Sequence, residues 1–286
     1  MDNRCNGVTQ KGLPCKRYAI NNNKCKIHDD GPAKVYLFDK QCITLTFSNV
    51  VENSVGMEQI GDINKHAPFT IERLTEIYNN YNGEKELIRL TLDEKDRPAN
   101  LIYEPAAILV LRNFYDDNSK NLFNKLVGLD WDTHALMKGE VKNKTARYNL
   151  CFADFEQEPD YINGKGRVIK INSIDQLINL QTQISDLTGY DDLNAEANYY
   201  FNIEKTGIGW HGDFERNIVI GIRFGDSMNL CFNWFHRFKP IGNKFTVTLN
   251  NTDLYIMSEK AVGQDWKKSS QLTLRHAAGS SKYTSL

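Results

Sequence analysis

The sequence predicts an α+β protein: a double-stranded β-helix (jelly-roll) core, flanking helices and a small Cys/His module at the N-terminus. Three observations lead to this prediction. From residue 198 onward, short β-branched and aromatic runs are broken by glycines at the spacing of a double-sheet jelly roll. Amphipathic helical segments precede that region, and residues 1–30 differ in composition from the rest. We therefore expect the module at 1–30, an extension of mixed α/β character at 33–105 and the jelly-roll domain at 106–286.

Length and composition allow a large buried core. The chain has 286 residues, of which 41% are hydrophobic and 11% aromatic. Its net charge of −1 provides no overall attraction to nucleic acid, so any such binding must come from local patches. No stretch approaches the roughly 18 apolar residues of a membrane-spanning helix, so we expect no membrane association.

Cysteine usage indicates a reducing compartment. The first residues lack the apolar core of a signal peptide, and six cysteines in a chain of this length are typical of free thiols or metal ligands. Cys42, Cys151 and Cys231 lie in apolar runs and are expected to be buried thiols. We expect an intracellular location, in the cytoplasm or nucleus, and the oligomeric state stays open.

The hydrophobic pattern predicts the first elements in chain order. β-Branched and aromatic content predicts strands at 35–38 and 42–47. Apolar residues at helical spacing predict a helix at 70–81. The apolar run 107–114 predicts a strand, and 118–127 predicts a second helix.

The clearest helix is expected at 174–188. Ser173 begins a capping box, in which a hydroxyl and a side-chain amide satisfy the first free backbone amides, and Gly189 offers a left-handed stop. Alternating apolar residues at 272–276 then predict a late strand that presents the imidazole of His276.

The N-terminal module has the pattern C-x9-C-x9-C-x2-H. A segment this short has too little apolar surface to fold alone, and a tetrahedral zinc site made by Cys5, Cys15, Cys25 and His28 is a usual remedy. Cations lie between these residues, which makes the module a candidate phosphate-binding element. The alternative is a disordered basic tail with incidental thiols.

One H-x-D pair carries the clearest chemical signal. Residues i and i+2 of a strand project from the same face, so His211 and Asp213 can grip one ion. With His276 they form the two-histidine, one-carboxylate set of a mononuclear non-haem iron(II) site. A surface turn rich in Gly, His and Asp is the alternative. Lys268 competes with His276 for the third position, but a protonated ammonium has no lone pair to give a metal.

The flanks of this pair extend the signal into a resemblance. The segment 198–232 contains Tyr200-Phe201-Asn202, the run Ile208 to Glu215 and the apolar strand Ile218 to Gly225. It resembles the metal-binding core of the AlkB family of Fe(II)/2-oxoglutarate dioxygenases. Ala107–Phe114 resembles the family's opening strand and Asp253–Met257 a late strand, so the resemblance covers about 106–286. The N-terminal module resembles small Cys-Cys-Cys-His modules in proteins of large DNA viruses, which suggests a viral origin.

The resemblance implies a function and its cofactors. Fe(II) would be held by His211, Asp213 and His276, with 2-oxoglutarate and O2 as co-substrates, and the reaction would demethylate or hydroxylate a nucleic-acid base. Relatives follow the distal histidine with two arginines that hold 2-oxoglutarate, whereas the only later cation here is Lys282. A buried carboxylate needs a cation. We therefore expect Lys282 first and Arg223 second in that role, with Asn202 as an additional donor.

Substrate contacts are expected from one group of aromatic and basic residues, and a second such group lies further along the chain. Arg147, Tyr148, Tyr161 and Lys165 lie where the family carries its substrate lid, although a solvent-facing hairpin with a Gly turn explains the same residues. Base stacking and phosphate contacts would be their roles. The second group follows on a predicted strand and turn, and consists of Trp234, His236, Arg237 and Lys239.

Two other functions remain open at this point. One is a catalytically silent jelly roll that binds nucleic acid through its zinc module, favoured by the missing terminal arginines. The other is an oxygenase that acts on a protein or a small molecule.

Overall fold

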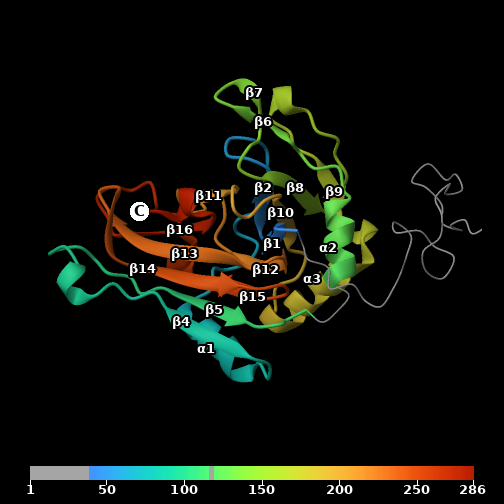
Figure 1. Cartoon of the computed structure of the whole chain (residues 1–286). Coiled ribbons are helices and arrows are strands. Elements are labelled where there is room, and N and C mark those ends of the chain that lie inside the picture. The colour runs from blue at the N-terminus through green and yellow to red at the C-terminus, as the bar shows by residue number, and fades with distance from the viewer. Residues whose placement is uncertain (1–38, 116–118) are drawn as a thin grey trace, which may run out of the picture. The chain divides into compact units, whose positions relative to one another are not determined.

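Two antiparallel-rich sheets dominate the computed structural model, which describes residues 39–115 and 119–286. The described residues belong to one compact unit. The fold is mixed α+β, rich in sheet and poor in helix, and its two main sheets form a β-sandwich (Figure 1). No helix in the described part of the chain is long and apolar enough to cross a membrane.

The larger sheet has eight strands, and the N-terminal strand β1 lies near its centre. β1 pairs antiparallel with β10 on one side and with β12 on the other. Among the described strand pairs of this sheet, β8 with β9 is the parallel one. In spatial order the strands are β4 (Lys85–Arg89), β5 (Ala107–Leu111), β15 (Leu254–Met257), β12 (Ile220–Gly225), β1 (Cys42–Ser48), β10 (Asn194–Tyr200), β8 (Tyr148–Ala153) and β9 (Val168–Lys170).

The smaller sheet has four strands and packs against one face of the larger sheet. Its spatial order is β11 (Gly207–His211), β16 (Thr273–Gly279), β13 (Met228–His236) and β14 (Lys239–Leu249). Two further hairpins are β2 (Val50–Glu52) with β3 (Gln59–Gly61) and β6 (His134–Met137) with β7 (Glu140–Asn143). The segment 39–105, expected as an extension, therefore contributes β1 and β4 to the same sheet as residues beyond 106.

Three helices of eight residues or more flank the sandwich in the described part of the chain (Figure 1). They are α1 (Ile71–Asn80), α2 (Ser119–Val127) and α3 (Asp175–Thr188). Short helical turns complete the list: η1 (Glu94–Asp96), η2 (Tyr161–Asn163), η3 (Ile171–Ser173), α4 (Glu259–Val262) and α5 (Ser281–Thr284). Apolar periodicity thus predicted the longer helices correctly.

The start of α3 differs from the expected capping box. Ser173 belongs to η3, and its hydroxyl donates to the carbonyl of Lys170 at 2.7 Å instead of capping the helix. Ile174 occupies the N-cap position without a side-chain hydrogen bond. The turn that precedes the helix therefore outcompetes the capping box. The C-terminal stop is as expected, since Gly189 has φ +74 and its amide donates to Ser185.

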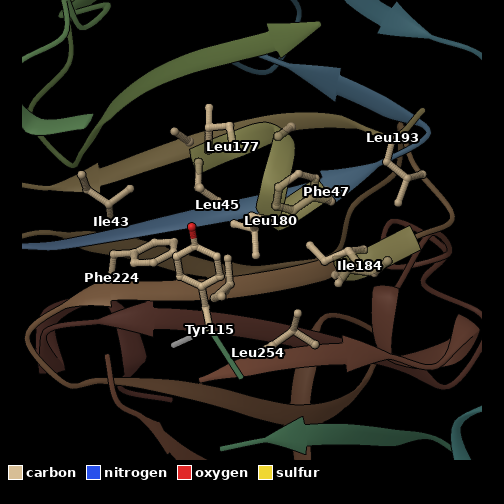
Figure 2. Packing of buried hydrophobic residues seen from close by; sticks show 14 of the residues in the cluster. Ile43, Leu45, Phe47, Tyr115, Leu177, Leu180, Ile184, Leu193, Phe224 and Leu254 are labelled. Carbon is tan, nitrogen blue, oxygen red and sulfur yellow. The ribbon is translucent and has the colours of Figure 1, made fainter. Parts of the chain in front are cut away.

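The two faces of β1 divide the interior of the protein. Side chains alternate across a strand, and Ile43, Leu45 and Phe47 point to the helix-covered face. Figure 2 shows them with Leu177, Leu180 and Ile184 of α3 in one buried apolar cluster. The alternate residues Cys42, Thr44 and Thr46 point to the space between the two sheets.

The space between the sheets is apolar at one end. Val110 and Tyr255 of the larger sheet pack there with Phe232, Trp234 and Leu274 of the smaller sheet. Trp234 is fully buried and its indole N–H donates to the carbonyl of Leu90 at 2.8 Å. This end stabilises the sandwich, while the end near β10, β1 and β12 carries polar side chains.

Replacing Leu45 by alanine tests the central role of β1. Leu45 is fully buried, so Leu45→Ala should lower the free energy of unfolding by about 2–5 kcal/mol. Urea unfolding followed by circular dichroism measures the change. Val55→Ala, at a position that is 81% exposed, is the control and should change it by less than about 0.5 kcal/mol. Equal effects of the two substitutions would contradict this placement of β1.

Candidate metal centre

Two histidines and one aspartate from distant parts of the chain converge on the smaller sheet. His211 ends β11 and lies directly opposite His276 of β16. The candidate ligand atoms of His211, Asp213 and His276 all lie within 4.8 Å of one another. Nε2 of His211 is 3.6 Å from one carboxylate oxygen of Asp213, and Nε2 of His276 is 3.8 Å from the other. These distances are too long for hydrogen bonds and match three donors arranged around one ion.

The ring nitrogens of His211 are in the state that a metal ligand requires. Nδ1 lies 2.7 Å from the carbonyl oxygen of Gly209, which can only accept, so Nδ1 carries the hydrogen and Nε2 keeps the lone pair. Burial, and then the neighbouring His276, lowers the pKa of His211 to about 3. The imidazole is therefore neutral at physiological pH. Burial raises the pKa of the Asp213 carboxyl, but His276 and Arg216 outweigh it and hold that pKa below its usual range.

A glycine between the two ligands allows the chain to pack tightly there. A Cβ at Gly212 would lie 2.1 Å from the carbonyl oxygen of Gly263, so no other residue fits without moving the backbone. Gly263 has φ +76 and ends the short helix α4. The amide of Asp213 donates to the carbonyl of Val262 at 3.0 Å. The α4 turn therefore fixes the backbone that presents the carboxylate.

A row of polar side chains crosses the larger sheet on the face toward the smaller sheet. Asn149, Asn198, Thr44 and Arg223 are successive cross-strand partners on β8, β10, β1 and β12. Asn149 donates to Asn198 at 2.9 Å, and Arg223 donates to the Thr44 hydroxyl at 2.5 Å. A sandwich interior is normally apolar, so four polar residues in register mark this end of the interior as suited to a polar ligand.

Arg223 is the exceptional member of this row, because it is a buried cation without a carboxylate. Its side chain is 1% exposed, and its Nη1 contacts Thr44 and, at 3.6 Å, the Cys42 sulfur. Its Nε is buried with no hydrogen-bond partner, and no ion pair joins it to any carboxylate among residues 39–115 and 119–286. Burying an unpaired charge is costly. An anionic ligand would remove that cost.

A cluster of glutamates around one buried arginine lies beside Asp213. Arg216 is 4% exposed and contacts Glu196 at 2.5 Å and Glu215 at 2.8 Å. Glu52 lies near the same group, and burial, with contributions from Glu215 and Glu196, raises its pKa to about 7 although the Gly56 amide opposes the shift. This cluster supports the segment that carries the metal-ligand candidate Asp213.

The comparisons with known proteins give one strong match. The chain is 44% identical over 249 residues to "Uncharacterized protein R156" of Acanthamoeba polyphaga mimivirus, a match that covers 85% of this chain and 98% of that protein. The chain belongs to the family of this mimivirus protein. No family model matches the chain. The name of the viral relative states no ligand or reaction, so the function of the site depends on its own chemistry.

Arg147 and Tyr148, which are neighbours in the expected substrate-binding group, point to opposite faces of the larger sheet. Arg147 lies on the His211 side: its Nε donates to Asn198, and its charge contributes to the lowered pKa of His211. Tyr148 instead stacks on Phe201 with ring centroids 4.6 Å apart and packs on the helix-covered face of the larger sheet. Because strand neighbours alternate, only one of the two can reach the site. The expectation for Tyr148 is corrected for this reason.

The expected lid is a hydrogen-bonded hairpin. The Tyr161 hydroxyl donates to the carboxylate of the fully buried Asp132 at 2.6 Å. The Lys165 ammonium lies 3.7 Å from a carboxylate oxygen of Glu58. Backbone pairing between Asp160 and Lys165 closes a turn at Gly164, which has φ +73. The alternative reading of these residues as a hairpin with a Gly turn therefore fits the structure, and their substrate contacts stay predictions.

The two cations predicted for the co-substrate differ in burial. Lys282 lies exposed on α5, with its ammonium 5.4 Å from the Tyr283 ring centroid, and does not meet the requirement for a buried cation. Arg223 does meet it. Asn202 lies in the turn after β10, where its side-chain oxygen accepts from the Glu204 amide at 3.0 Å. Asn198, four residues earlier, is the asparagine that belongs to the polar row.

The cysteines fall into two sets, three in the described part of the chain and three in the predicted zinc module. Cys42, Cys151 and Cys231 are buried free thiols, as expected. The zinc ligands predicted at Cys5, Cys15, Cys25 and His28 lie outside the described residues. Sequence reasoning missed Thr44 and Asn198, and the only signal for them is polar residues at alternate positions within otherwise apolar strands.

The raised pKa of Glu52 predicts a pH-dependent stability. In the unfolded chain this carboxyl ionises near its ordinary pKa, whereas in the folded protein it ionises only near pH 7. The folded state thus binds the proton more tightly, and stability falls as pH rises from about 5 to 8. Glu52→Gln should therefore raise the free energy of unfolding at pH 8 by about 1–3 kcal/mol and much less at pH 5.

Urea unfolding at the two pH values measures this difference. Glu140→Gln, at an exposed position on β7, is the control and should leave the pH dependence unchanged. A Glu52→Gln curve parallel to that of the wild type would show that Glu52 ionises normally in the fold.

Proposed function

We propose that the chain is an Fe(II)/2-oxoglutarate-dependent dioxygenase of the AlkB type. The observation that carries the proposal is the convergence of His211, Asp213 and His276, with both Nε2 atoms near the same carboxylate. Two imidazoles and one carboxylate leave open positions on one side of an iron ion. The donor set fits this metal, because His211 is neutral with its lone pair at Nε2. When bound, the iron supplies the oxidising chemistry by which O2 and 2-oxoglutarate oxidise a substrate C–H bond.

The order of the strands supports a jelly-roll core for this enzyme. From β10 to β16 the strands fall in the larger, smaller, larger, smaller, smaller, larger and smaller sheet. If the strands from β10 to β16 are numbered one to seven, the spatial order of the smaller sheet is two, seven, four, five. Four neighbouring strands of the larger sheet have the order one, β1, three, six. An eight-stranded roll needs an eighth strand at that place. We infer that β1, from before the other seven strands, takes the role of the last strand.

This permuted arrangement explains the absent terminal arginines. In the resemblance, those arginines follow the distal histidine on the last strand. Here the corresponding strand is β1, whose side chains toward the smaller sheet are Cys42, Thr44 and Thr46. The cation comes instead from Arg223, the cross-strand partner of Thr44 on β12. We infer that Arg223, with the Thr44 hydroxyl, binds the distal carboxylate of 2-oxoglutarate.

Different side chains of the protein then have different roles at the site. Arg223 orients the co-substrate from β12, and the apolar cluster of Phe232 and Leu274 limits access of water from the other end. Arg147, placed on the His211 side, is positioned to contact an anionic or base-containing substrate. The proposed substrate is a nucleic-acid base, which the enzyme demethylates or hydroxylates.

Removing the carboxylate ligand tests the proposed reaction. Purified protein given ferrous iron, ascorbate, O2 and 2-oxoglutarate should form succinate, and Asp213→Ala should reduce succinate to the background without metal. Asp191→Ala, at an exposed position, is the control and should retain wild-type turnover. Mass spectrometry of succinate measures the rate. Wild-type turnover by Asp213→Ala, or none by the wild type with or without a methylated oligonucleotide, would contradict the proposal.

Replacing the buried arginine tests the co-substrate assignment separately. Truncating one partner of a buried charge pair costs about 2–5 kcal/mol, so Arg223→Gln should raise the KM for 2-oxoglutarate about thirtyfold or more. Lys282→Ala should leave that KM unchanged, because Lys282 is exposed on α5. Initial rates at varied 2-oxoglutarate give both constants. The reverse pattern would return the role to Lys282.

A further inference from the structure

On the side of the smaller sheet that faces away from the larger sheet, cations and aromatic rings alternate, and two of them, Arg275 and Phe235, are buried. The Lys267 ammonium lies 5.0 Å from the Phe214 ring centroid and 5.5 Å from that of Trp266. The Arg275 guanidinium lies 5.3 Å from Trp266, 4.4 Å from Phe235 and 5.4 Å from Phe238. We call these six residues the cation–aromatic ladder. Arg275 points away from the triad, since its strand neighbour His276 points inward.

The cations of the ladder and of its neighbouring residues form no ion pairs within the described part of the chain. Arg237, Lys239, Lys267 and Lys268 form no ion pair with a carboxylate in the described part of the chain, and Arg275 donates only to the Trp266 carbonyl at 3.1 Å. The whole chain has a net charge of −1, so this concentration of free cations is local. Such a patch attracts a polyanion.

The rings at the two ends of the ladder remain open to solvent. Phe214 is 61% exposed and Phe238 is 56% exposed. A cation beside an aromatic ring leaves the rest of its surface free for a flat partner. Exposed rings interleaved with cations are the features by which proteins hold single-stranded nucleic acid, because bases stack on the rings while cations follow the phosphates.

The hairpin that presents Phe238 is strained. Arg237 and Phe238 have φ +50 and +62 and form the two-residue turn between His236 and Lys239. Two positive φ values define a type I′ turn, which prefers Asn-Gly over bulky side chains. Strain of this kind persists where the side chains serve another purpose. Here it places an arginine and an exposed ring side by side at the tip of β13 and β14.

A hollow beside this hairpin offers room for a base. It has a volume of about 480 Å³, within the range of small-molecule sites. Arg237 and His236 line one side of it, and Ser269 and Ser270 lie on the loop that follows Lys268. Among the described residues that line it, none is acidic. A nucleobase or its phosphate would therefore meet polar side chains and the Arg237 cation there.

We propose that the cation–aromatic ladder and the Arg237–Phe238 hairpin bind single-stranded nucleic acid. Lys267, Lys268 and Arg237 contact successive phosphates, and Phe214 and Phe238 stack on bases. This surface lies on the opposite side of the smaller sheet from His276, so the proposal stands whether or not the triad oxidises a base. An acidic peptide would use the cations but leave the two exposed rings unexplained, whereas an anionic membrane can take up exposed rings and is distinguished by the test below.

Fluorescence anisotropy with a labelled thymidine oligonucleotide of about 20 nucleotides tests this binding. Phe238→Gly removes the ring and supplies the residue that the turn prefers, so the hairpin should fold at least as well. Its affinity should fall about fivefold or more, the loss expected of one stacked base. Lys267→Ala with Lys268→Ala should make the slope of log K against log salt shallower by about 1.4.

The matched controls remove side chains of the same two types, a phenylalanine ring and a lysine, at other exposed positions. Phe155→Ala replaces another exposed ring, and Lys125→Ala an exposed cation on α2, and both should bind as the wild type does. All variants keep residues 1–38, so any contribution of that segment is common to the whole series. Thermal unfolding of each variant confirms that the fold is retained.

Three results would overturn the proposal. The first is that Phe238→Gly and the double variant Lys267→Ala, Lys268→Ala have affinities and salt slopes within twofold of those of the control variants. The second is tighter binding of a blunt duplex than of a single strand of equal length, because duplex bases are not free to stack. The third is loss of binding to anionic vesicles in the same variants while oligonucleotide binding persists, which would assign the face to a membrane.

Discussion

The pairing of β1 between β10 and β12 is the constraint on which the rest of the structure depends. Every residue from Cys42 to Ser48 has a partner on β10, and those from Cys42 to Phe47 also have one on β12. Without this strand the larger sheet would divide into one part ending at β10 and another ending at β12. The cost of joining such distant segments is the closure of long loops, which grows only slowly with their length.

This one strand also separates two kinds of interior. On its helix-covered side, Ile43, Leu45 and Phe47 bury apolar surface against α3, which supplies stability without chemistry (Figure 2). On its other side, Thr44 joins Asn198 and Arg223 in a polar row. A strand that alternates between these two environments fixes the register strongly, because a shift by one residue would exchange them. The position of Arg223 relative to the triad is therefore held by packing on the opposite face.

The fold was predictable from the sequence to the extent that its signals are local. Helical spacing predicted α1 and α3, and β-branched alternation predicted β1 and β16, which delivers His276 opposite His211. The H-x-D spacing likewise predicted that His211 and Asp213 lie close together, although β11 ends at His211 and Asp213 follows it outside the strand.

The parts that were not predictable depend on partners far along the chain. Nothing near Thr44 shows that it will lie beside Arg223, because that pairing is set by the whole sheet. Arg147 and Tyr148 could not be told apart until the face of β8 toward the site was known. The preference for Lys282 followed from its place as the only cation after His276 in the sequence, and nothing local shows that Arg223 is the buried cation. Ser173 was misassigned because η3 competes locally for its hydroxyl.

The central claim is that the three side chains surround one iron ion while Arg223 receives the far carboxylate of the co-substrate. Crystals grown without oxygen in the presence of Fe(II) and 2-oxoglutarate, with anomalous diffraction collected at the iron absorption edge, test it most directly. The account predicts one iron peak bonded to Nε2 of His211, Nε2 of His276 and a carboxylate oxygen of Asp213, with 2-oxoglutarate reaching Arg223. Fully occupied crystals with the iron elsewhere, or with the co-substrate directed away from β12, would contradict it.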